Sequence, residues 1–328
     1  MDINEYIKMK ETKINLADYE PSGAGALGES YISKINPNIL LKLYSREREQ
    51  MGYDEHERAC KVYQIGVSCP APGELVRTEE GLLGIQFRRI VGKKSYARAL
   101  SEHPERLEEY AARFAEECKR LHSIRPEPGI FPTAKEQCLS HIRLNQFLSD
   151  EEKAGLERYV GNLPDADTAL HGDLHYGNII FTEDGRQYFI DLGNFCTGTP
   201  LFDLAIIYRQ TCLMPEPFIK ENYHINAATA RDFWRAFVPH YFGPDARIEE
   251  VEAMLKPYNT LRSIAVEQAF GEYRPAIRPA LREMIQSTQI ASAQSSKNNR
   301  TRRPSPPAPT LNLLSSPPEK KKTEHVKN

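Results

Sequence analysis

The sequence predicts an α+β fold in which a small antiparallel sheet is followed by a larger, mostly helical part. Residues 1–90 contain short apolar runs separated by turn residues, which is the pattern of strands. Residues 100–290 instead carry apolar residues at helical spacing over most of their length. Because Pro, Ser and Lys become frequent after that point, we expect residues 292–328 to form a disordered tail.

The composition is that of an ordinary globular protein. Of 328 residues, 40% are hydrophobic and 27% are charged, and the formal net charge is −2. A chain without a basic excess is not expected to bind nucleic acid. No apolar run reaches the roughly 18 residues of a membrane span, and the first residues show neither the basic nor the apolar region of a signal peptide, so none is expected. With six scattered cysteines, the sequence indicates a cytoplasmic protein and gives no sign of an obligate protein partner.

The sheet is expected to contain two strand pairs. The first pair is formed by 31–33 and 39–44, and the turn residues Asn-Pro-Asn separate its strands. The second pair is formed by 73–76 and 84–90. Between the two pairs, the charged stretch 45–65 has the periodicity of a helix.

Two features organise the helical part. An apolar stripe along 107–121 predicts a helix that packs on one face, and Ser149 with Glu152 forms the pattern of a capping box at the start of another helix. Only 168–194 is expected to interrupt the helices, with short apolar segments that resemble strands.

The interrupting segment carries the residues with chemical potential. It reads His-Gly-Asp-Leu-His-Tyr-Gly-Asn over 171–178, and Asp-Leu-Gly follows from residue 191. The strands 179–181 and 188–190 with the turn Glu-Asp-Gly between them predict a hairpin that carries Asp173, Asn178 and Asp191 at its ends. Phosphoryl transfer needs a carboxylate to orient the attacking hydroxyl and oxygen ligands for Mg²⁺. Asp173 suits the first role, and Asn178 and Asp191 suit the second.

Two other interpretations of this segment remain open. Aspartates and asparagines also cap surface loops without any chemistry. A metal hydrolase would use His171, Asp173 and His175 as ligands. Neither interpretation requires Asn178 or the later Asp191.

The spacing Asp-x-x-x-x-Asn followed by Asp-x-Gly is that of protein kinases. Together with Gly-Thr-Pro-Leu-Phe-Asp-Leu-Ala over 198–205, the motif resembles the aminoglycoside phosphotransferase and choline kinase superfamily. The resemblance covers about residues 15–290. It implies a protein-kinase-like two-lobed fold with an N-lobe over 1–90 and a C-lobe over 91–291, and it implies ATP and Mg²⁺. It also implies that Asp203 anchors the catalytic loop, which His171 is expected to brace.

The same resemblance directs attention to a glycine-rich segment and a lysine in the N-lobe. Gly23, Gly25 and Gly28 form G-x-G-x-x-G, and strand-like residues follow, so we expect a flap whose backbone amides approach phosphates rather than a dinucleotide-binding turn. Lys42 lies within an apolar strand and is expected to bind the α- and β-phosphates, although an outward-facing lysine is the ordinary alternative.

A glutamate of the following helix should position this lysine. Glu55 lies on the same helix face as Ala59 and Val62 and has the family's spacing from the Gly-Val-Ser-Cys-Pro segment that follows, so it is preferred, and Glu57 is the alternative.

We therefore expect transfer of the γ-phosphoryl group of ATP to a hydroxyl of a small molecule, such as an aminoglycoside, an amino alcohol or a sugar. The alternatives are an atypical protein kinase and a catalytically weak nucleotide-binding module. The acceptor region 205–290 carries acids such as Glu267 and bases such as Arg262, so the charge of the acceptor is open. His175 replaces a protein-kinase lysine and is a candidate pH-dependent partner of the γ-phosphate.

Overall fold

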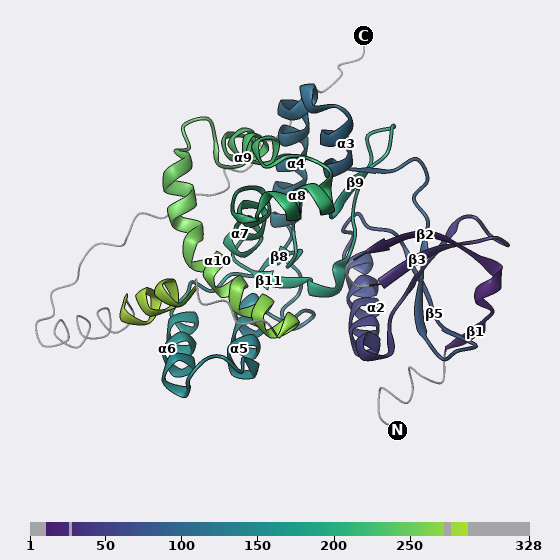
Figure 1. The fold of residues 1–328 in the computed structure, drawn as a ribbon, viewed down its shortest axis with the longest axis horizontal. Helices are drawn as coiled ribbons and strands as arrows, with labels where there is room; N and C mark the ends of the chain where they lie inside the picture. The colour runs from purple at the N-terminus through teal and green to yellow at the C-terminus, as the bar shows by residue number, and fades with distance from the viewer. Residues whose placement is uncertain (1–10, 26–27, 272–276, 288–328) are drawn as a thin grey trace, which may run out of the picture. The chain divides into compact units, whose positions relative to one another are not determined.

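The computed structural model describes residues 11–25, 28–271 and 277–287, and Figure 1 shows their fold. The chain divides into two compact units, Met1–Thr288 and Gln289–Asn328. The second unit, which holds the predicted tail, lies outside the described residues. The boundary between the two predicted lobes stays a prediction.

A six-stranded sheet forms the N-terminal part of the first unit. In spatial order its strands are β1 (Thr12–Ile14), β5 (Pro72–Thr78), β6 (Leu83–Arg88), β4 (Ile39–Leu43), β3 (Gly28–Ser33) and β2 (Tyr19–Gly25). Neighbouring strands are antiparallel except β1 and β5, which run parallel. Both predicted strand pairs are present, as β3–β4 and β5–β6, with ends shifted by a few residues.

Helix α2 (Glu49–Gln64) contacts β5 and β6 and lies against the sheet (Figure 1). It falls within the predicted helical stretch 45–65. Ala59 and Val62 are fully buried, as expected for the face that packs on the strands. The same face also buries Glu55, a carboxylate that needs a charged or hydrogen-bonding partner in such surroundings.

Helices dominate the rest of the unit. They are α3 (Tyr96–Glu102), α4 (Leu107–His122), α5 (Ala134–Leu144), α6 (Asp150–Gly161), α7 (Leu201–Tyr208), α8 (Glu216–Tyr223), α9 (Ala227–Phe242) and α10 (Ile248–Phe270). The predicted stripe forms the buried face of α4, where the Phe114 ring lies 5.5 Å from Phe233 and 5.8 Å from Phe237 of α9. The predicted capping box of Ser149 and Glu152 is present at the start of α6.

Two small sheets lie among these helices. One pairs β8 (Thr168–Leu170) with β11 (Cys196–Gly198), and the other has the order β10 (Gln187–Phe189), β9 (Ile179–Phe181) and β7 (Lys94–Ser95). The predicted hairpin is β9–β10. The expected limits of the strand region were too narrow, because β11 lies outside 168–194, and β7, which precedes the predicted helical stretch, was not expected. Two- and three-residue strands are too short to show an alternating pattern in the sequence.

Short helical turns complete the described part of the chain. They are η1 (Leu16–Asp18), η2 (Arg46–Arg48), η3 (Pro104–Arg106), η4 (Leu192–Asn194) and the π-helical turn η5 (Arg209–Leu213). None of the helices that could be searched, those over the described residues, has the length and apolar character needed to cross a bilayer.

Candidate active site

The loop between β8 and β9, residues 171–178, is hydrogen-bonded to the residue that precedes Asp191. Nε2 of His171 lies 2.8 Å from the Ile190 carbonyl oxygen. The Ile190 amide in turn donates to the Asn178 carbonyl oxygen at 3.0 Å. The loop that carries Asp173 and the segment that carries Asp191 therefore form one connected unit.

Asp203 fixes the start of this loop from the first turn of α7. It is fully buried, and its two carboxylate oxygens each accept a backbone N–H at 2.8 Å, from His171 and from Gly172. Nε2 of His122 lies 3.2 Å from one of these oxygens. Three polar partners offset the loss of hydration of a buried carboxylate.

The turn at Gly172 leaves no room for a side chain. Its φ is +77°, and a Cβ atom there would lie 2.0 Å from the Asn194 carbonyl oxygen. Glycine at this position lets the backbone of the loop approach Asn194 of η4 closely.

Asp173 and Asn178 are linked within the loop. Nδ2 of Asn178 donates to the Asp173 carbonyl oxygen at 2.9 Å, and Asn178 is only 5% exposed. The Asp173 side chain remains 25% exposed, so its carboxylate is accessible while its backbone is held. Asp191 has a φ of 59°, which is uncommon for a residue other than glycine. Such a backbone persists where the surrounding contacts impose it.

Lys42 of β4 joins the sheet to this unit. Its ammonium lies 2.8 Å from both carboxylate oxygens of Glu55 and 2.8 Å from Oδ1 of Asp191. The hydroxyl of Tyr44 also donates to Glu55, at 2.6 Å. The lysine is therefore held between a carboxylate of α2 and a carboxylate that follows β10.

The charges of this group reinforce one another. Burial opposes the charged form of Lys42, but the carboxylates of Asp191 and Glu55 outweigh it and raise the pKa of the ammonium. Burial likewise acts against ionised Asp191, but the adjacent Lys42 ammonium keeps the pKa of that carboxyl below its ordinary value. Both groups are therefore charged at neutral pH.

The two glutamates that the sequence left as alternatives have different partners. Glu55 contacts Lys42, whereas Glu57 pairs with Lys61 one helical turn away, 2.6 Å apart at the surface of α2. A second link joins α2 to the same region, since the guanidinium of Arg58 donates to the Gly193 carbonyl oxygen.

The glycine-rich segment lies at the edge of the sheet next to the lysine strand. Gly23 and Gly25 are in β2, Gly28 begins β3, and Gly25 is paired with Gly28 across the two strands. Residues 26–27 lie outside the described residues. Ser30 of β3 is the register partner of Lys42, so the glycine-bearing strand pair and the lysine strand are consecutive in the sheet.

Asn178 and Asp191 offer hard oxygen ligands from the open end of the β9–β10 hairpin, because Asn178 precedes β9 and Asp191 follows β10. Mg²⁺ in nucleotide sites is commonly held by one or two protein oxygens, with phosphates and water completing the shell. The donor set of one carboxylate and one amide oxygen fits that requirement. It does not amount to a protein-only metal cage, and the described residues contain no cluster of three His, Cys, Asp or Glu side chains arranged to hold a metal.

The arrangement contradicts the metal-hydrolase alternative. His171 is engaged by the Ile190 carbonyl oxygen, and Nδ1 of His175 accepts a hydrogen bond from the Gly177 amide at 3.0 Å. The two imidazoles and Asp173 are thus used in separate contacts rather than converging on one point.

His175 packs against aromatic rings instead of standing in solvent. Its ring centroid lies 5.5 Å from that of Tyr223. Burial lowers the pKa of His175, and the nearby Asp173 carboxylate opposes that shift without cancelling it. These contacts favour the neutral ring, and its predicted role toward the γ-phosphate stays a prediction.

The structure adds one residue that the sequence did not single out. Arg262 of α10 donates to Oδ1 of Asp173 at 2.8 Å, and the two side chains are 26% and 25% exposed. In the sequence Arg262 was one of several basic residues of the acceptor region. Helical periodicity places it on α10, but no sequence signal relates it to a carboxylate 89 positions away.

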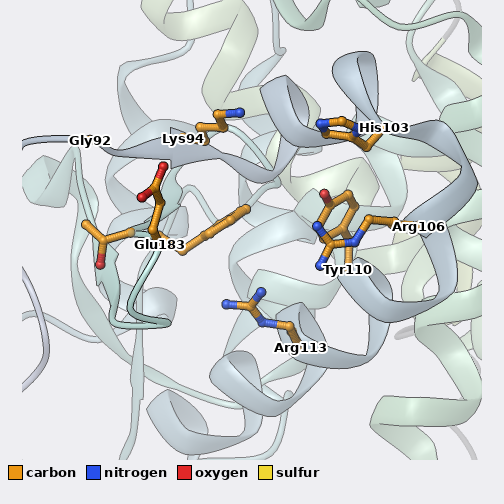
Figure 2. A pocket seen from close by; sticks show the side chains of 9 residues that line it. Gly92, Lys94, His103, Arg106, Tyr110, Arg113 and Glu183 are labelled. Carbon is orange, nitrogen blue, oxygen red and sulfur yellow. The ribbon is translucent and has the colours of Figure 1, made fainter.

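A cavity of about 260 Å³ lies elsewhere, lined in part by residues of β7, β9 and α4 (Figure 2). Its lining residues include none of the predicted site residues; they are Gly92, Lys94, His103, Arg106, Tyr110, Arg113, Phe181, Thr182 and Glu183. Lys94 and Arg106 are paired with glutamates at 2.7 and 2.6 Å. This cavity is therefore not the site formed by Lys42, Asp173 and Asp191.

Comparisons with known proteins were made for sequence and for fold. The model of the phosphotransferase enzyme family matches residues 20–237, which run from β2 to α9. A search of curated protein sequences finds no significant match.

Among solved structures, an aminoglycoside-3'-phosphotransferase of type VIII is 17% identical with a TM-score of 0.53, covering 75% of this chain and 94% of that chain. The gentamicin complex of APH(2")-IIa is 16% identical with a TM-score of 0.50, covering 88% and 95%. At such identities the likeness concerns the fold. It confirms the predicted kinase-like α+β fold, with a sheet-containing N-lobe and a helical C-lobe.

Proposed function

The chain belongs to the phosphotransferase enzyme family, and from this premise we propose that it transfers the γ-phosphoryl group of ATP to a hydroxyl of a small molecule. The observation that carries the proposal is the contact of the Lys42 ammonium with both Glu55 and Asp191. This contact joins the sheet to the hydrogen-bonded unit that presents Asp173.

The nucleotide would lie between the glycine-bearing strands β2 and β3 and the Asp191 segment. Lys42 supplies the cation for the phosphates, and Glu55 fixes its position with the help of the Tyr44 hydroxyl. Gly25 and Gly28 are paired across the two strands. Because glycine has no side chain, a phosphate can approach the backbone amides at these two positions.

Asn178 and Asp191 are the residues that would hold Mg²⁺. When bound, the ion neutralises phosphate oxygens and so favours the departure of ADP. Lys42 contacts Asp191 and keeps the carboxylate of this proposed ligand ionised.

Asp173 acts on the acceptor. Its carboxylate orients the hydroxyl and accepts the hydroxyl proton while the oxygen forms a bond to the γ-phosphorus, and the bond from that phosphorus to the β–γ bridging oxygen breaks. The products are ADP and the phosphorylated acceptor. His171 and Asp203 do no chemistry in this scheme, since their contacts keep the loop in place, whereas Asn178 both braces the loop and would hold Mg²⁺.

The segment after Asp191 supports a small acceptor rather than a protein substrate. It passes through η4 and β11 directly into α7, which begins at Leu201, and β11 is paired with β8. This leaves no long activation segment of the kind on which protein kinases dock a peptide.

The test measures phosphate transfer from ATP, and in parallel from GTP, to a panel of sugars, amino alcohols, hydroxy acids and aminoglycosides such as gentamicin. We expect one acceptor class to be turned over and the Asp173→Asn variant to lose at least about a thousandfold in kcat with nucleotide binding retained. Asp184→Asn, in the exposed turn of the same hairpin, is the matched control and should behave as the wild type.

Absence of turnover for every acceptor, together with no rise in melting temperature on adding ATP and Mg²⁺, would refute the proposal. Equal activity of the Asp173→Asn variant would refute the role of Asp173 alone.

A further inference from the structure

Arg262 occupies one of the two carboxylate oxygens of Asp173, the residue proposed to act on the acceptor hydroxyl. An acceptor hydroxyl must approach the Asp173 carboxylate, yet Oδ1 of that carboxylate already accepts a hydrogen bond from the Arg262 guanidinium at 2.8 Å. Both side chains are about three-quarters buried, at 26% and 25% exposure. An acceptor hydroxyl that approaches the Asp173 carboxylate therefore also comes close to the Arg262 guanidinium.

A second guanidinium is fixed on the same side of α10. Arg209, at the start of η5, donates to Oδ1 of Asn259 at 3.2 Å and to Oγ of Ser263 at 2.9 Å. Asn259 and Ser263 are one turn apart on α10 and flank Arg262 in sequence. Arg209 thus adds a second positive charge beside α10, and η5, on which it lies, accepts a hydrogen bond from the Tyr176 hydroxyl of the Asp173 loop at the Gln210 carbonyl oxygen.

The charge of Arg262 also reaches a neighbouring histidine. Burial lowers the pKa of His141 on α5, and Arg262 lowers it further. An ammonium group of an acceptor would enter the same field and be repelled, whereas a carboxylate or a phosphate would be attracted. An anion would also give the guanidinium a partner once the carboxylate of Asp173 turns to the hydroxyl.

On the basis of the function proposed above, we propose that the acceptor is a small hydroxylated anion and that Arg262 binds its carboxylate or phosphate group. Binding exchanges the Asp173 carboxylate on Arg262 for the anion of the acceptor and leaves Asp173 to take the hydroxyl proton. Arg262 thereby couples recognition of the acceptor charge to release of the carboxylate that acts on it.

This role is not carried by the family match. The matched region ends at residue 237, before α10 begins at Ile248. Arg262 therefore lies outside the region that the family model matches.

The experiment compares acceptors of related carbon skeleton that carry a negative, a neutral or a positive group. One series is glucose, gluconate, glucose phosphate and glucosamine, and the other is glycerol, glycerate, glycerol phosphate and aminopropanediol. Each compound is tested for phosphate transfer and, with a non-hydrolysable ATP analogue and Mg²⁺ present, for its effect on the melting temperature. The carboxylate and phosphate members separate the two possible anions.

The variants are Arg262→Gln, Arg262→Lys and, as a matched control, Arg247→Gln, whose exposed side chain lies at the start of the same helix. We expect the wild type to prefer anionic members in at least one series. In Arg262→Gln, KM for the preferred anion should rise at least about tenfold, which corresponds to about 1.4 kcal/mol, with KM for ATP unchanged. The Lys variant should recover part of the loss, and Arg247→Gln should show none.

Two results would overturn the inference while leaving the proposed function intact. The first is a wild type that binds nucleotide but prefers no anionic acceptor. This includes the case in which no member of either series is phosphorylated or changes the melting temperature. The second is an Arg262→Gln variant that loses activity equally on charged and neutral acceptors, since that would assign Arg262 only to holding Asp173 in place. Failure to bind nucleotide at all would instead refute the proposed function, and the inference with it.

Discussion

The ammonium of Lys42 lies 2.8 Å from a carboxylate oxygen of Asp191, although 149 positions separate the two residues in sequence. One belongs to the second strand of a hairpin in the sheet, and the other follows a hairpin among the helices. The contact means that the two lobes share a single charge cluster, which also includes Glu55. Anything that alters one member changes the electrostatic balance of the others.

Replacing Lys42 should therefore affect stability as well as nucleotide binding. In Lys42→Met, the Glu55 side chain, 6% exposed, loses its cation, so we expect the free energy of unfolding to fall by about 3 kcal/mol. The double variant Lys42→Met with Glu55→Gln should recover most of this loss, because the glutamine is neutral and can still accept from Tyr44. Chemical denaturation measures the stability, and calorimetric titration with ATP and Mg²⁺ should show binding lost in both.

Lys61→Met is the matched control for this pair of variants. Lys61 forms an exposed pair with Glu57 on the same helix, so its loss should change stability by no more than about 0.5 kcal/mol. A double variant no more stable than Lys42→Met would contradict the assignment of the loss to unpaired Glu55.

We expect the position of the loop 171–178 to depend on the two hydrogen-bond-accepting oxygens of ionised Asp203 and not on the size of its side chain. In Asp203→Asn, one of the two oxygens that accept from His171 and Gly172 becomes an NH₂ group and faces a backbone donor. We expect unfolding to become easier by about 1–3 kcal/mol, and kcat to fall while KM for ATP changes little. Urea denaturation and steady-state kinetics measure these effects. Asp232→Asn, in an exposed pair with Arg235, should leave both quantities unchanged, and similar losses in this control would point to a general effect of charge.

The sequence predicts well those parts of the site that depend on residues close together in the chain, because turn type and helix periodicity are set by neighbouring residues. The β9–β10 hairpin follows from two apolar strands around a Glu-Asp-Gly turn, and the orientation of Glu55 toward the sheet follows from helix phase with Ala59 and Val62. The contact between Arg262 and Asp173 depends instead on how α10 packs against the loop. Periodicity identifies which residues share a helix face, but it does not identify the partner which that face meets.

The same limit explains the strands that were not expected. β1, β7 and β11 contain two or three residues each, and each is a strand only because a partner is present, β5, β9 and β8 respectively. Backbone hydrogen bonds to those partners, rather than any side-chain pattern, define them.

Stability should fall on the acid side of neutrality, in part because of His141. The folded-state pKa of this ring lies below its ordinary 6.5, so the unfolded chain binds the proton more tightly. Stability therefore rises with pH through the window below 6.5 and levels off above it. His141→Gln should reduce the loss of unfolding free energy between pH 7 and pH 5, measured by urea denaturation. Burial lowers the pKa of His175 too, so part of the loss should remain.

The pKa of His141 can also be followed directly by NMR titration. In Arg262→Gln that pKa should rise toward its ordinary value, because one of the two causes of the shift is removed. Arg247→Gln should not move it. An unchanged His141 pKa in Arg262→Gln would contradict the proximity of the two side chains.

Asn178 combines two roles that different substitutions separate. Its Nδ2 donates to the Asp173 carbonyl oxygen at 2.9 Å, and its side-chain oxygen is the proposed Mg²⁺ ligand. Asn178→Asp keeps an oxygen but loses the donor, whereas Asn178→Leu loses both. We expect the Mg²⁺ concentration at half-maximal activity to stay within about threefold of the wild type for the aspartate variant and to rise at least about tenfold for the leucine variant.

The stability of the two variants distinguishes binding of Mg²⁺ by the Asn178 oxygen from the hydrogen bond that Asn178 donates to the Asp173 backbone. Both lose the hydrogen bond to the Asp173 backbone, so each should unfold about 1 kcal/mol more easily than the wild type. Equal stability losses combined with unequal Mg²⁺ requirements would assign metal binding to the oxygen of residue 178. If the aspartate variant instead needed as much Mg²⁺ as the leucine variant, the side chain would act through the loop alone, and Asp191 would be left as the protein ligand.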